Sequence, residues 1–241
     1  MKVFKIIGNY IGVPYFRLLY HFCKIVLRYF PRKDKLGSFG LNSILEYPVF
    51  FDTTQNVYID KDVIIRCTAR FINSPSERIY VKQYTVIGPD CIIMTNSHQK
   101  CVGIPMFLSA PSNMRDKSAD TTIGEDVWIG AKVSIMPGVN IGRGCIVGTG
   151  SLVTHSTPPY SVVMGSPARI VGKVFEKKDI VLHEEKIYDA NNRIQTNELD
   201  RIFEEYHYDE IKTYGNNTPL NLEEQQVLEK YKLELNFTGI N

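Results

Sequence analysis

Residues 122–155 read TIGEDVWIGAKVSIMPGVNIGRGCIVGTGSLVTH, and their regular spacing of aliphatic residues indicates the fold. An aliphatic residue stands at every sixth position, and glycine often follows it. A unit of this length is too short for a strand plus a helix. It fits one face of a parallel β-solenoid, in which three hexads make a coil and stacked coils bury an aliphatic ladder. The repeating positions are Ile123, Ile129, Ile135, Ile141, Val147 and Val153.

The same phase extends upstream of the quoted stretch, stops at residue 98 and resumes at 123. Ala69 and Pro75 weaken it beside a turn at 73–76. We therefore predict about five coils, with an inserted loop at 99–120 that has a functional role. The upstream positions are Leu45, Phe51, Val57, Val63, Val81, Ile87 and Ile93. Three cysteines fall on the fifth position of a hexad and are predicted to fill the interior: Cys67, Cys91 and Cys145.

Charge is distributed unevenly along the 241 residues, although the formal net charge is only +2. Residues 1–36 carry a net charge of +7, and residues 174–241 carry −7. The small total argues against a nucleic-acid binder. Together with the hexads, the charge zones predict three regions: a basic helical region at 1–44, a solenoid at 45–173 and an acidic helical extension at 174–241.

The five cysteines include no CxxC pair, and the chain shows no secretory leader. These features favour a protein of the reducing cytosol. Arg17, His21, Lys24 and Arg28 interrupt the one apolar stretch that approaches the length of a membrane-spanning helix. We therefore expect no transmembrane segment.

The quoted stretch, with Gly148-Thr149-Gly150-Ser151 and Gly165-Ser166-Pro167-Ala168-Arg169, resembles the hexapeptide-repeat acyltransferases. It is most similar to the branch of galactoside, maltose and polysaccharide O-acetyltransferases. The resemblance implies a left-handed parallel β-helix, acetyl-CoA as cosubstrate, and a homotrimer with active sites between subunits. It covers about residues 45–173 and does not extend into the acidic tail.

His98 ends a hexad immediately before the interruption. Acyl transfer to an alcohol requires removal of the hydroxyl proton, and neutral imidazole suits that task near neutral pH. Family resemblance places the catalytic base here, acting by direct transfer without an acyl-enzyme. Asn73 resembles an asparagine that assists at the reacting centre in this family, although a turn-forming role is an equal alternative. Residues 99–120 would form a flap over the acceptor.

For coenzyme A, the resemblance implies an edge of the solenoid on which backbone groups of Ala131 and Thr149 meet the pantetheine arm. Trp128 would supply an apolar wall, and Thr154 would lie near the adenine. Arg169 and Lys173 would meet the phosphates, although Lys173 is one residue off the family position. Packed or solvated roles are the alternatives for Trp128 and the two basic residues.

Zinc chemistry is not expected. The γ-type carbonic anhydrases share the fold but need three zinc histidines, whereas the repeat region holds only His98 and His155. No phosphate-binding P-loop or dinucleotide fingerprint is present either.

The two ends of the chain predict helices. Charges at 14–30 recur on one stripe of an otherwise apolar helix, which would cap the solenoid or lie against anionic lipid. In the acidic tail, one helix is expected from Asn197 through Tyr206, and another after Pro219, where Asn221 and Glu224 are spaced as a capping box.

The sequence therefore predicts a cytoplasmic O-acetyltransferase acting on a sugar, polysaccharide or lipid-linked saccharide precursor. An N-acetyltransferase for an amino-sugar nucleotide is one alternative, and a non-catalytic trimeric scaffold is another.

Overall fold

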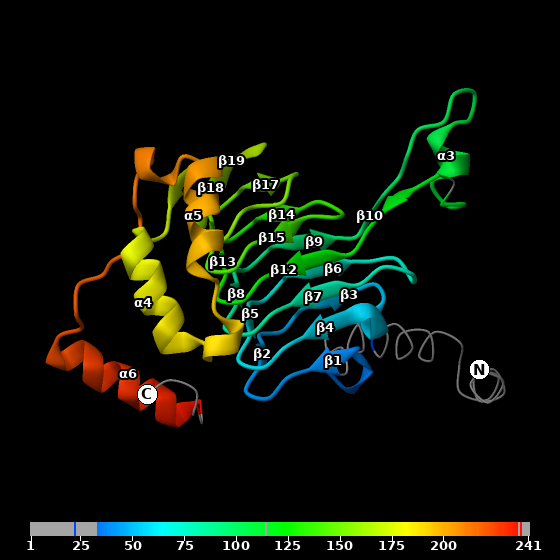
Figure 1. Ribbon diagram of the computed structural model, residues 1–241. Helices are drawn as coiled ribbons and strands as arrows, with labels where there is room; N and C mark the ends of the chain where they lie inside the picture. The colour runs from blue at the N-terminus through cyan, green and yellow to red at the C-terminus, as the bar shows by residue number, and fades with distance from the viewer. Residues whose placement is uncertain (1–21, 23–32, 114, 236, 238–241) are drawn as a thin grey trace, which may run out of the picture.

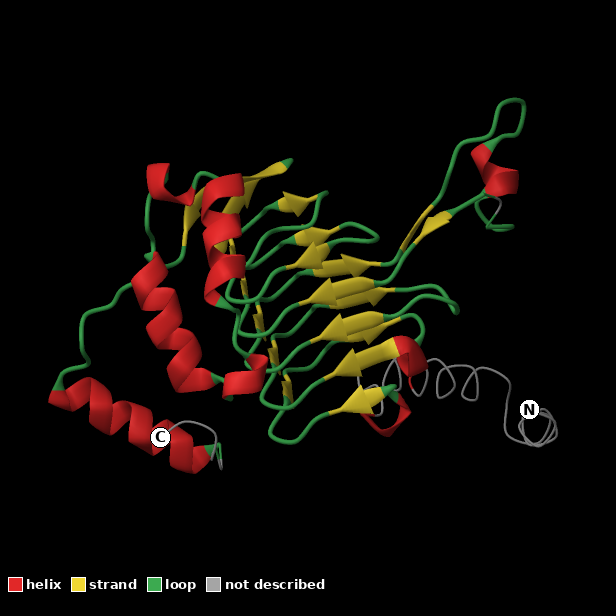
Figure 2. Ribbon diagram, in the orientation of Figure 1, coloured by secondary structure: helices red, strands yellow, loops and turns green. Residues whose placement is uncertain are grey.

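The computed structural model describes Phe22 and residues 33–113, 115–235 and 237. The helix expected at 14–30 lies outside the described residues, apart from Phe22. The chain winds into a parallel β-helix whose short strands stack into three sheets along a prism (Figures 1 and 2). No helix among these residues is long and apolar enough to cross a bilayer.

Each sheet takes one strand from each coil. Sheet A contains β1 (Ser38–Phe39), β4 (Val57–Ile59), β7 (Ile79–Val81), β12 (Thr121–Ile123) and β15 (Asn140–Ile141). Sheet B contains β2 (Ile44–Leu45), β5 (Ile64–Ile65), β8 (Val86–Ile87), β13 (Trp128–Ile129), β16 (Ile146–Val147), β18 (Ser161–Gly165) and the antiparallel β19 (Ala168–Lys173). Sheet C contains β3 (Phe50–Phe51), β6 (Arg70–Ile72), β9 (Ile92–Met94), β14 (Ser134–Ile135) and β17 (Leu152–Val153).

The helical elements are η1 (Lys33–Lys35), η2 (Thr54–Asn56), α3 (Met106–Ser109), α4 (Lys177–Ile187), η3 (Ala190–Asn192), α5 (Thr196–Glu205), η4 (Tyr208–Glu210) and α6 (Leu222–Glu234). The two short 3-10 helices η1 and η2 lie by the first coil, α3 lies on the inserted loop, and the helices after residue 173 lie alongside the coils (Figure 1). The prediction of α5 and of the α6 capping box is confirmed. The sequence missed α4, because its two buried residues are Ile180 and a charged Glu184.

Inward side chains form one continuous aliphatic core, in which stacked positions of successive coils contact each other. All six repeating positions of the quoted stretch are no more than 1% exposed. Neighbouring coils satisfy the backbone hydrogen bonds, so the hexad stabilises the fold only when coils stack.

The upstream register differs from the one that the period predicted. Leu45 pairs with Ile65 and Ile65 with Ile87, at separations of 20 and 22 residues. The later pair Ile129 and Val147 is 18 residues apart, which is three hexads. The early coils are therefore longer than three hexads.

The additional residues lie at one corner, where the chain passes from sheet C to sheet A. Phe51 and Ile59 are aligned positions that lie 8 residues apart rather than six, and Phe71 and Val81 lie 10 apart. The insertions add two and four residues, which together equal one hexad. The six-residue period is therefore in register again from Val81 onward, by coincidence. The prediction for Cys67 is consequently wrong: it lies at a corner and is half-buried.

The other two interior cysteines are confirmed. Cys91 is 1% exposed and Cys145 is fully buried. Burial raises the pKa of the Cys91 thiol to about 11 and also raises that of Cys145. Both act as small apolar core residues.

The acidic extension packs against the last coils through a second core that includes Tyr160, Leu199 and Phe203. Glu184 of α4 anchors this contact although only 2% of it is exposed. Its carboxylate accepts hydrogen bonds from Tyr160 Oη at 2.6 Å, Arg143 Nη1 at 2.9 Å and the backbone N–H of Ile194 at 2.9 Å. Burial and this carboxylate raise the pKa of Tyr160.

We expect Glu184→Ala to lower the free energy of unfolding by about 3 kcal/mol, because it removes one of the two carboxylates that pair with Arg143 and leaves the buried Tyr160 hydroxyl without its acceptor. Urea denaturation measures this loss. Glu185→Ala, at an exposed neighbouring position, is the control and should change stability by less than about 0.5 kcal/mol. Equal effects of the two variants would contradict the anchoring role.

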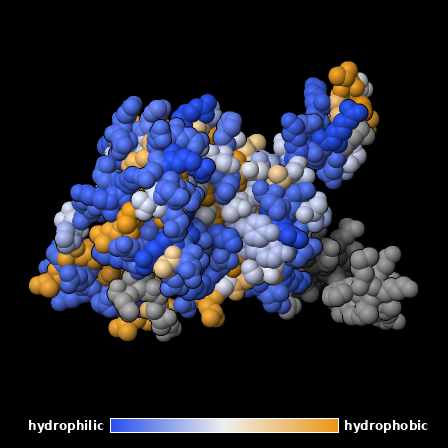
Figure 3. Space-filling model, viewed as in Figure 1, coloured by the Kyte–Doolittle hydropathy of each residue, from blue (hydrophilic) through white to orange (hydrophobic). Residues whose placement is uncertain are grey.

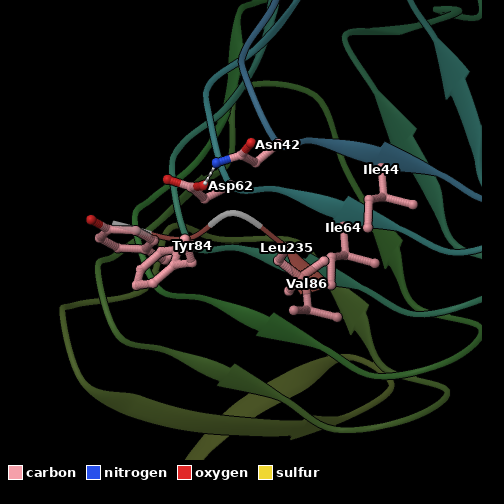
Figure 4. Close-up of a pocket in the computed structure, with 8 residues that line it drawn as sticks. Asn42, Ile44, Asp62, Ile64, Tyr84, Val86 and Leu235 are labelled. Atoms are coloured by element: carbon pink, nitrogen blue, oxygen red, sulfur yellow. Dashed lines mark hydrogen bonds between the residues drawn. The ribbon is translucent and has the colours of Figure 1, made fainter. Parts of the chain in front are cut away.

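The end of the described chain returns to the outer face of sheet B. Leu235 lies over the outward side chains Ile44, Ile64 and Val86 (Figure 4). Together with Tyr84 and Phe237, whose ring centroids are 5.9 Å apart, they line a partly open, mainly apolar pocket of about 220 Å³. This contact ties the tail to the first three coils.

Candidate active site

The interruption of the hexads forms an arm that projects from the corner between sheets C and A (Figure 1). Two short antiparallel strands, β10 (Asn96–Ser97) and β11 (Lys117–Ser118), form its root. Its tip carries α3 and is apolar, as Figure 3 shows. Val102, Phe107 and Leu108 are all exposed there. The tip makes no core contact within the described chain.

The register of the arm places His98 opposite Asp116. Asn96 pairs with Ser118 and Ser97 with Lys117, so the next pair along the hairpin is His98 with Asp116. His98 Nδ1 lies 2.8 Å from Asp116 Oδ2. A carboxylate only accepts hydrogen bonds, so Nδ1–H is the donor, and in the neutral imidazole Nε2 then carries the lone pair.

The two side chains of this pair differ in exposure. That of His98 is 44% exposed, whereas that of Asp116 is 9% exposed. Asp116 Oδ1 is buried and receives no hydrogen bond from the part of the chain that the structure describes. The arrangement can orient an imidazole whose free nitrogen accepts a proton from a bound hydroxyl. No local pattern pointed to Asp116, because it lies 18 residues from His98 in an irregular segment.

Asn73 lies at the same corner, one coil before the arm, and is 4% exposed. Its Nδ2 donates to the carbonyl of Thr53 at 2.9 Å, and its Oδ1 accepts from the N–H of Thr53 at 3.2 Å. These bonds join two successive coils. One amide N–H of Asn73 is left for a further contact, so its predicted role at the reacting centre stays a prediction.

Trp128, Ala131 and Thr149 lie together on another part of the prism. Trp128 projects from the outer face of sheet B and is 57% exposed. Ala131 and Thr149 occupy stacked turns between sheets B and C, where the N–H of Gly150 donates to the carbonyl of Ala131 at 2.9 Å. Gly150 has a φ of +73°, and no atom lies within 4 Å of the Cβ that another residue would add. The backbone is therefore open to a ligand beside an exposed aromatic face.

Two further residues predicted to bind coenzyme A, Arg169 and Thr154, differ in how exposed they are. Arg169 is exposed, and its Nη1 donates to the adjacent Ala168 carbonyl at 2.9 Å. Thr154 is half-buried at the end of β17, with its Oγ1 2.9 Å from His155 Nδ1. Both side chains remain candidates for ligand contact.

Lys173 does not fit its predicted role. It is 2% exposed, and its Nζ donates to the Tyr208 carbonyl at 2.7 Å and lies 3.1 Å from Glu176 Oε2. The acidic extension covers this side chain, so it holds the second core together and does not reach a phosphate. This corrects the sequence-based prediction.

Within one chain, the predicted base lies away from Trp128, Ala131 and Thr149, although Thr154 follows β17 of sheet C at the corner from which the arm projects. His98 lies on the arm at the corner between sheets C and A, whereas Trp128 lies on sheet B, the opposite side of the prism (Figures 1 and 2). A ligand on the outer face of sheet B therefore does not reach the imidazole of the same chain.

The described residues hold no group of three or more His, Cys, Asp or Glu side chains arranged to bind a metal ion.

Comparison with known proteins identifies the family of this chain. A family model for the bacterial transferase hexapeptide (six repeats) matches residues 120–155. Galactoside O-acetyltransferase of Escherichia coli strain K12 is 31% identical over 146 residues, covering 60% of this chain and 68% of that protein. The chain belongs to the hexapeptide-repeat acetyltransferases.

Solved structures of this acetyltransferase family share the fold. A galactoside acetyltransferase in complex with coenzyme A has 26% sequence identity and a TM-score of 0.52, covering 68% of this chain and 74% of that one. A hexapeptide-repeat acetyltransferase from Vibrio cholerae, complexed with acetyl coenzyme A, has 25% identity and a TM-score of 0.53, covering 60% and 74%. The parallel solenoid is thus the left-handed β-helix of the family.

Proposed function

We propose that this acetyltransferase moves the acetyl group of acetyl-CoA to a hydroxyl of a sugar, or of a polysaccharide or lipid-linked saccharide precursor, with His98 as general base. The pairing of His98 with Asp116 at the root of the arm carries the proposal. Coenzyme-bound relatives and the open backbone beside Trp128 support acetyl-CoA as cosubstrate.

Asp116 holds the imidazole through Nδ1–H, and Nε2 takes the proton of the acceptor hydroxyl. The freed oxygen forms the ester bond to the acetyl carbonyl, and the carbon–sulfur bond of the thioester breaks. The departing coenzyme A sulfur then receives the proton from His98, which returns the imidazole to its starting state. Acetyl-CoA supplies the activated acyl group, so no acyl-enzyme is required.

The separation of His98 from Trp128 supports active sites between subunits of a homotrimer. The arm of one subunit would bring His98 and Asp116 to the coenzyme edge of the next. Asn73 and Thr154 contribute to the same site in this proposal, at the acceptor and adenine ends respectively. In this proposal the reaction takes place in the cytosol, and the basic segment 14–30 would either cap the solenoid or meet a membrane that carries a lipid-linked acceptor.

Arg169→Ala should weaken coenzyme A binding about tenfold, because it removes one charged hydrogen bond to a phosphate. Calorimetric titration with coenzyme A measures the dissociation constant. Arg201→Ala, which removes an exposed arginine on α5, is the matched control and should bind as the unmodified chain does. An unchanged affinity in Arg169→Ala would remove this residue from the site.

Transfer of radiolabelled acetyl from acetyl-CoA to saccharide acceptors tests the function itself. An O-acetyl product is an ester that mild alkali or hydroxylamine cleaves, whereas an N-acetyl product on an amino sugar resists both. Alkali-stable product would overturn the O-acetyl proposal in favour of N-acetylation. A folded protein that binds neither coenzyme A nor acetyl-CoA would favour the scaffold.

A further inference from the structure

The corner at residues 73–78 connects to the root of the arm through the carboxylate of Glu77. Three serine hydroxyls donate to this carboxylate. Two come from its own corner, Ser74 and Ser76, the latter at 3.0 Å. The third comes from Ser118, 41 residues further along the chain on β11, at 2.8 Å. One side chain therefore joins two segments that are distant in sequence.

Neighbouring contacts fix both ends of the arm to the same corner. On the incoming side, the N–H of Ser74 donates to Thr95 Oγ1 at 3.1 Å, just before β10. On the outgoing side, the N–H of Arg78 donates to Asp120 Oδ1 at 2.8 Å, just after β11. The N–H of Thr121 donates to the Arg78 carbonyl at 3.0 Å. The corner at residues 73–78 thus contacts the chain on both sides of the root of the arm and supports the arm.

The arm needs this support because few other contacts fix its orientation. Its two strands contain two residues each, and a hairpin of that size is marginal by itself. Its tip is exposed. Ser118 is two residues from Asp116, and the hairpin register transmits its position to the pairing of His98 with Asp116.

We propose that Glu77 is a positioning residue for catalysis: by holding Ser118, it sets the arm at the angle that brings His98 and Asp116 to the substrate. This inference rests on the proposed function, since it assumes that His98 is the base. Glu77 itself touches neither substrate nor the reacting atoms. Its carboxylate suits the role because it offers only acceptors, so all three hydroxyls can donate to it at once.

The test compares Glu77→Ala and Ser118→Ala with the unmodified trimer in the acetyl-transfer assay. Each variant should lower kcat about ten- to a hundredfold, because a small misplacement of the base is costly, while coenzyme A affinity stays unchanged. The double variant should be no slower than either single one, since both changes remove the same contact. Glu77→Gln keeps one acceptor oxygen and should recover part of the rate.

Glu46→Ala is the matched control, because it removes a glutamate that also bridges coils, to Arg66, at a corner away from the arm. It should leave kcat unchanged. Nitrogen-15 NMR of labelled histidine reports independently on the arm: Glu77→Ala should reduce the Nδ1–H tautomer of His98, which a purely structural contact elsewhere would not affect.

Two results separate the inference from the function on which it rests. Full kcat and an unchanged His98 spectrum in Glu77→Ala, beside an inactive His98→Ala, would overturn the positioning role and leave the function in place. Full activity in His98→Ala would overturn the proposed function, and the His98 spectrum of Glu77→Ala would then decide by itself whether Glu77 orients the arm.

Discussion

His98→Ala is expected to reduce kcat for acetyl transfer by roughly 10²- to 10⁴-fold, the usual contribution of a general base. The side chain lies on the arm, outside the coils, so its removal leaves the core untouched. Coenzyme A should bind with unchanged affinity, because Trp128 and Arg169 of sheet B and the turns at Ala131 and Thr149 lie away from the arm. Steady-state kinetics with saturating acetyl-CoA, together with calorimetry, measure both quantities.

His155→Ala provides the matched control, since His155 is the other histidine of the repeat region and is exposed. It should keep most of the activity. A His98→Ala enzyme with near-normal kcat would contradict the assignment of the base.

The same variant also tests whether active sites form between subunits. Chains of His98→Ala co-assembled with chains of the double variant Trp128→Ala, Arg169→Ala would place an intact His98 beside an intact coenzyme edge at some interfaces. In a ring that assembles at random from equal amounts, about a quarter of the sites are intact. The mixture should recover about that fraction of the activity. Activity no higher than that of the separate variants would show that each chain completes its own site.

Asp116→Asn is expected to lower kcat by roughly ten- to a hundredfold, because partners that orient a functional imidazole typically contribute that much. An amide can present its nitrogen to Nδ1, which would favour the tautomer with the proton on Nε2, the wrong nitrogen for a base. Coenzyme A affinity should not change. Kinetics at saturating acetyl-CoA check the rate, and histidine NMR checks the tautomer.

Asp120→Asn is a useful comparison, because Asp120 lies in the same segment but accepts a hydrogen bond from the backbone of Arg78 rather than from His98. The asparagine keeps an acceptor oxygen, so its effect on kcat should be smaller than that of Asp116→Asn. If both variants were equally slow, the loss would reflect a disturbed arm rather than the pairing of Asp116 with His98.

The hexads from Ile123 to Val153 predicted the solenoid because each coil contacts mainly its neighbours, so a local period describes nearly all of the packing. The same six-residue period predicted the wrong register for part of the chain before Val81. Insertions at one corner lengthen two coils, and only the pairing of strands such as Leu45 with Ile65 reveals their register. Cys67 was therefore assigned to the interior when it lies at a corner.

In the acidic tail, too, a local feature could be predicted from the sequence and a long-range contact could not. Asn221 and Glu224 form a capping box that the sequence alone predicts, since both partners lie within one turn. The burial of Lys173 beneath Tyr208 and Glu176 depends on how the tail folds back, and no local pattern encodes it.

At the candidate active site, a histidine that ends a hexad beside an insertion could be identified from the chain alone, because the repeats resemble those of acetyltransferases. The folded chain was needed to show that Asp116 faces His98, that Glu77 connects the arm to an earlier coil, and that His98 and Trp128 lie on different sides of the prism. This difference arises because a repeat specifies contacts between residues at a regular spacing along the chain. Contacts across a long insertion depend on the register and direction of strands that meet only in the folded chain.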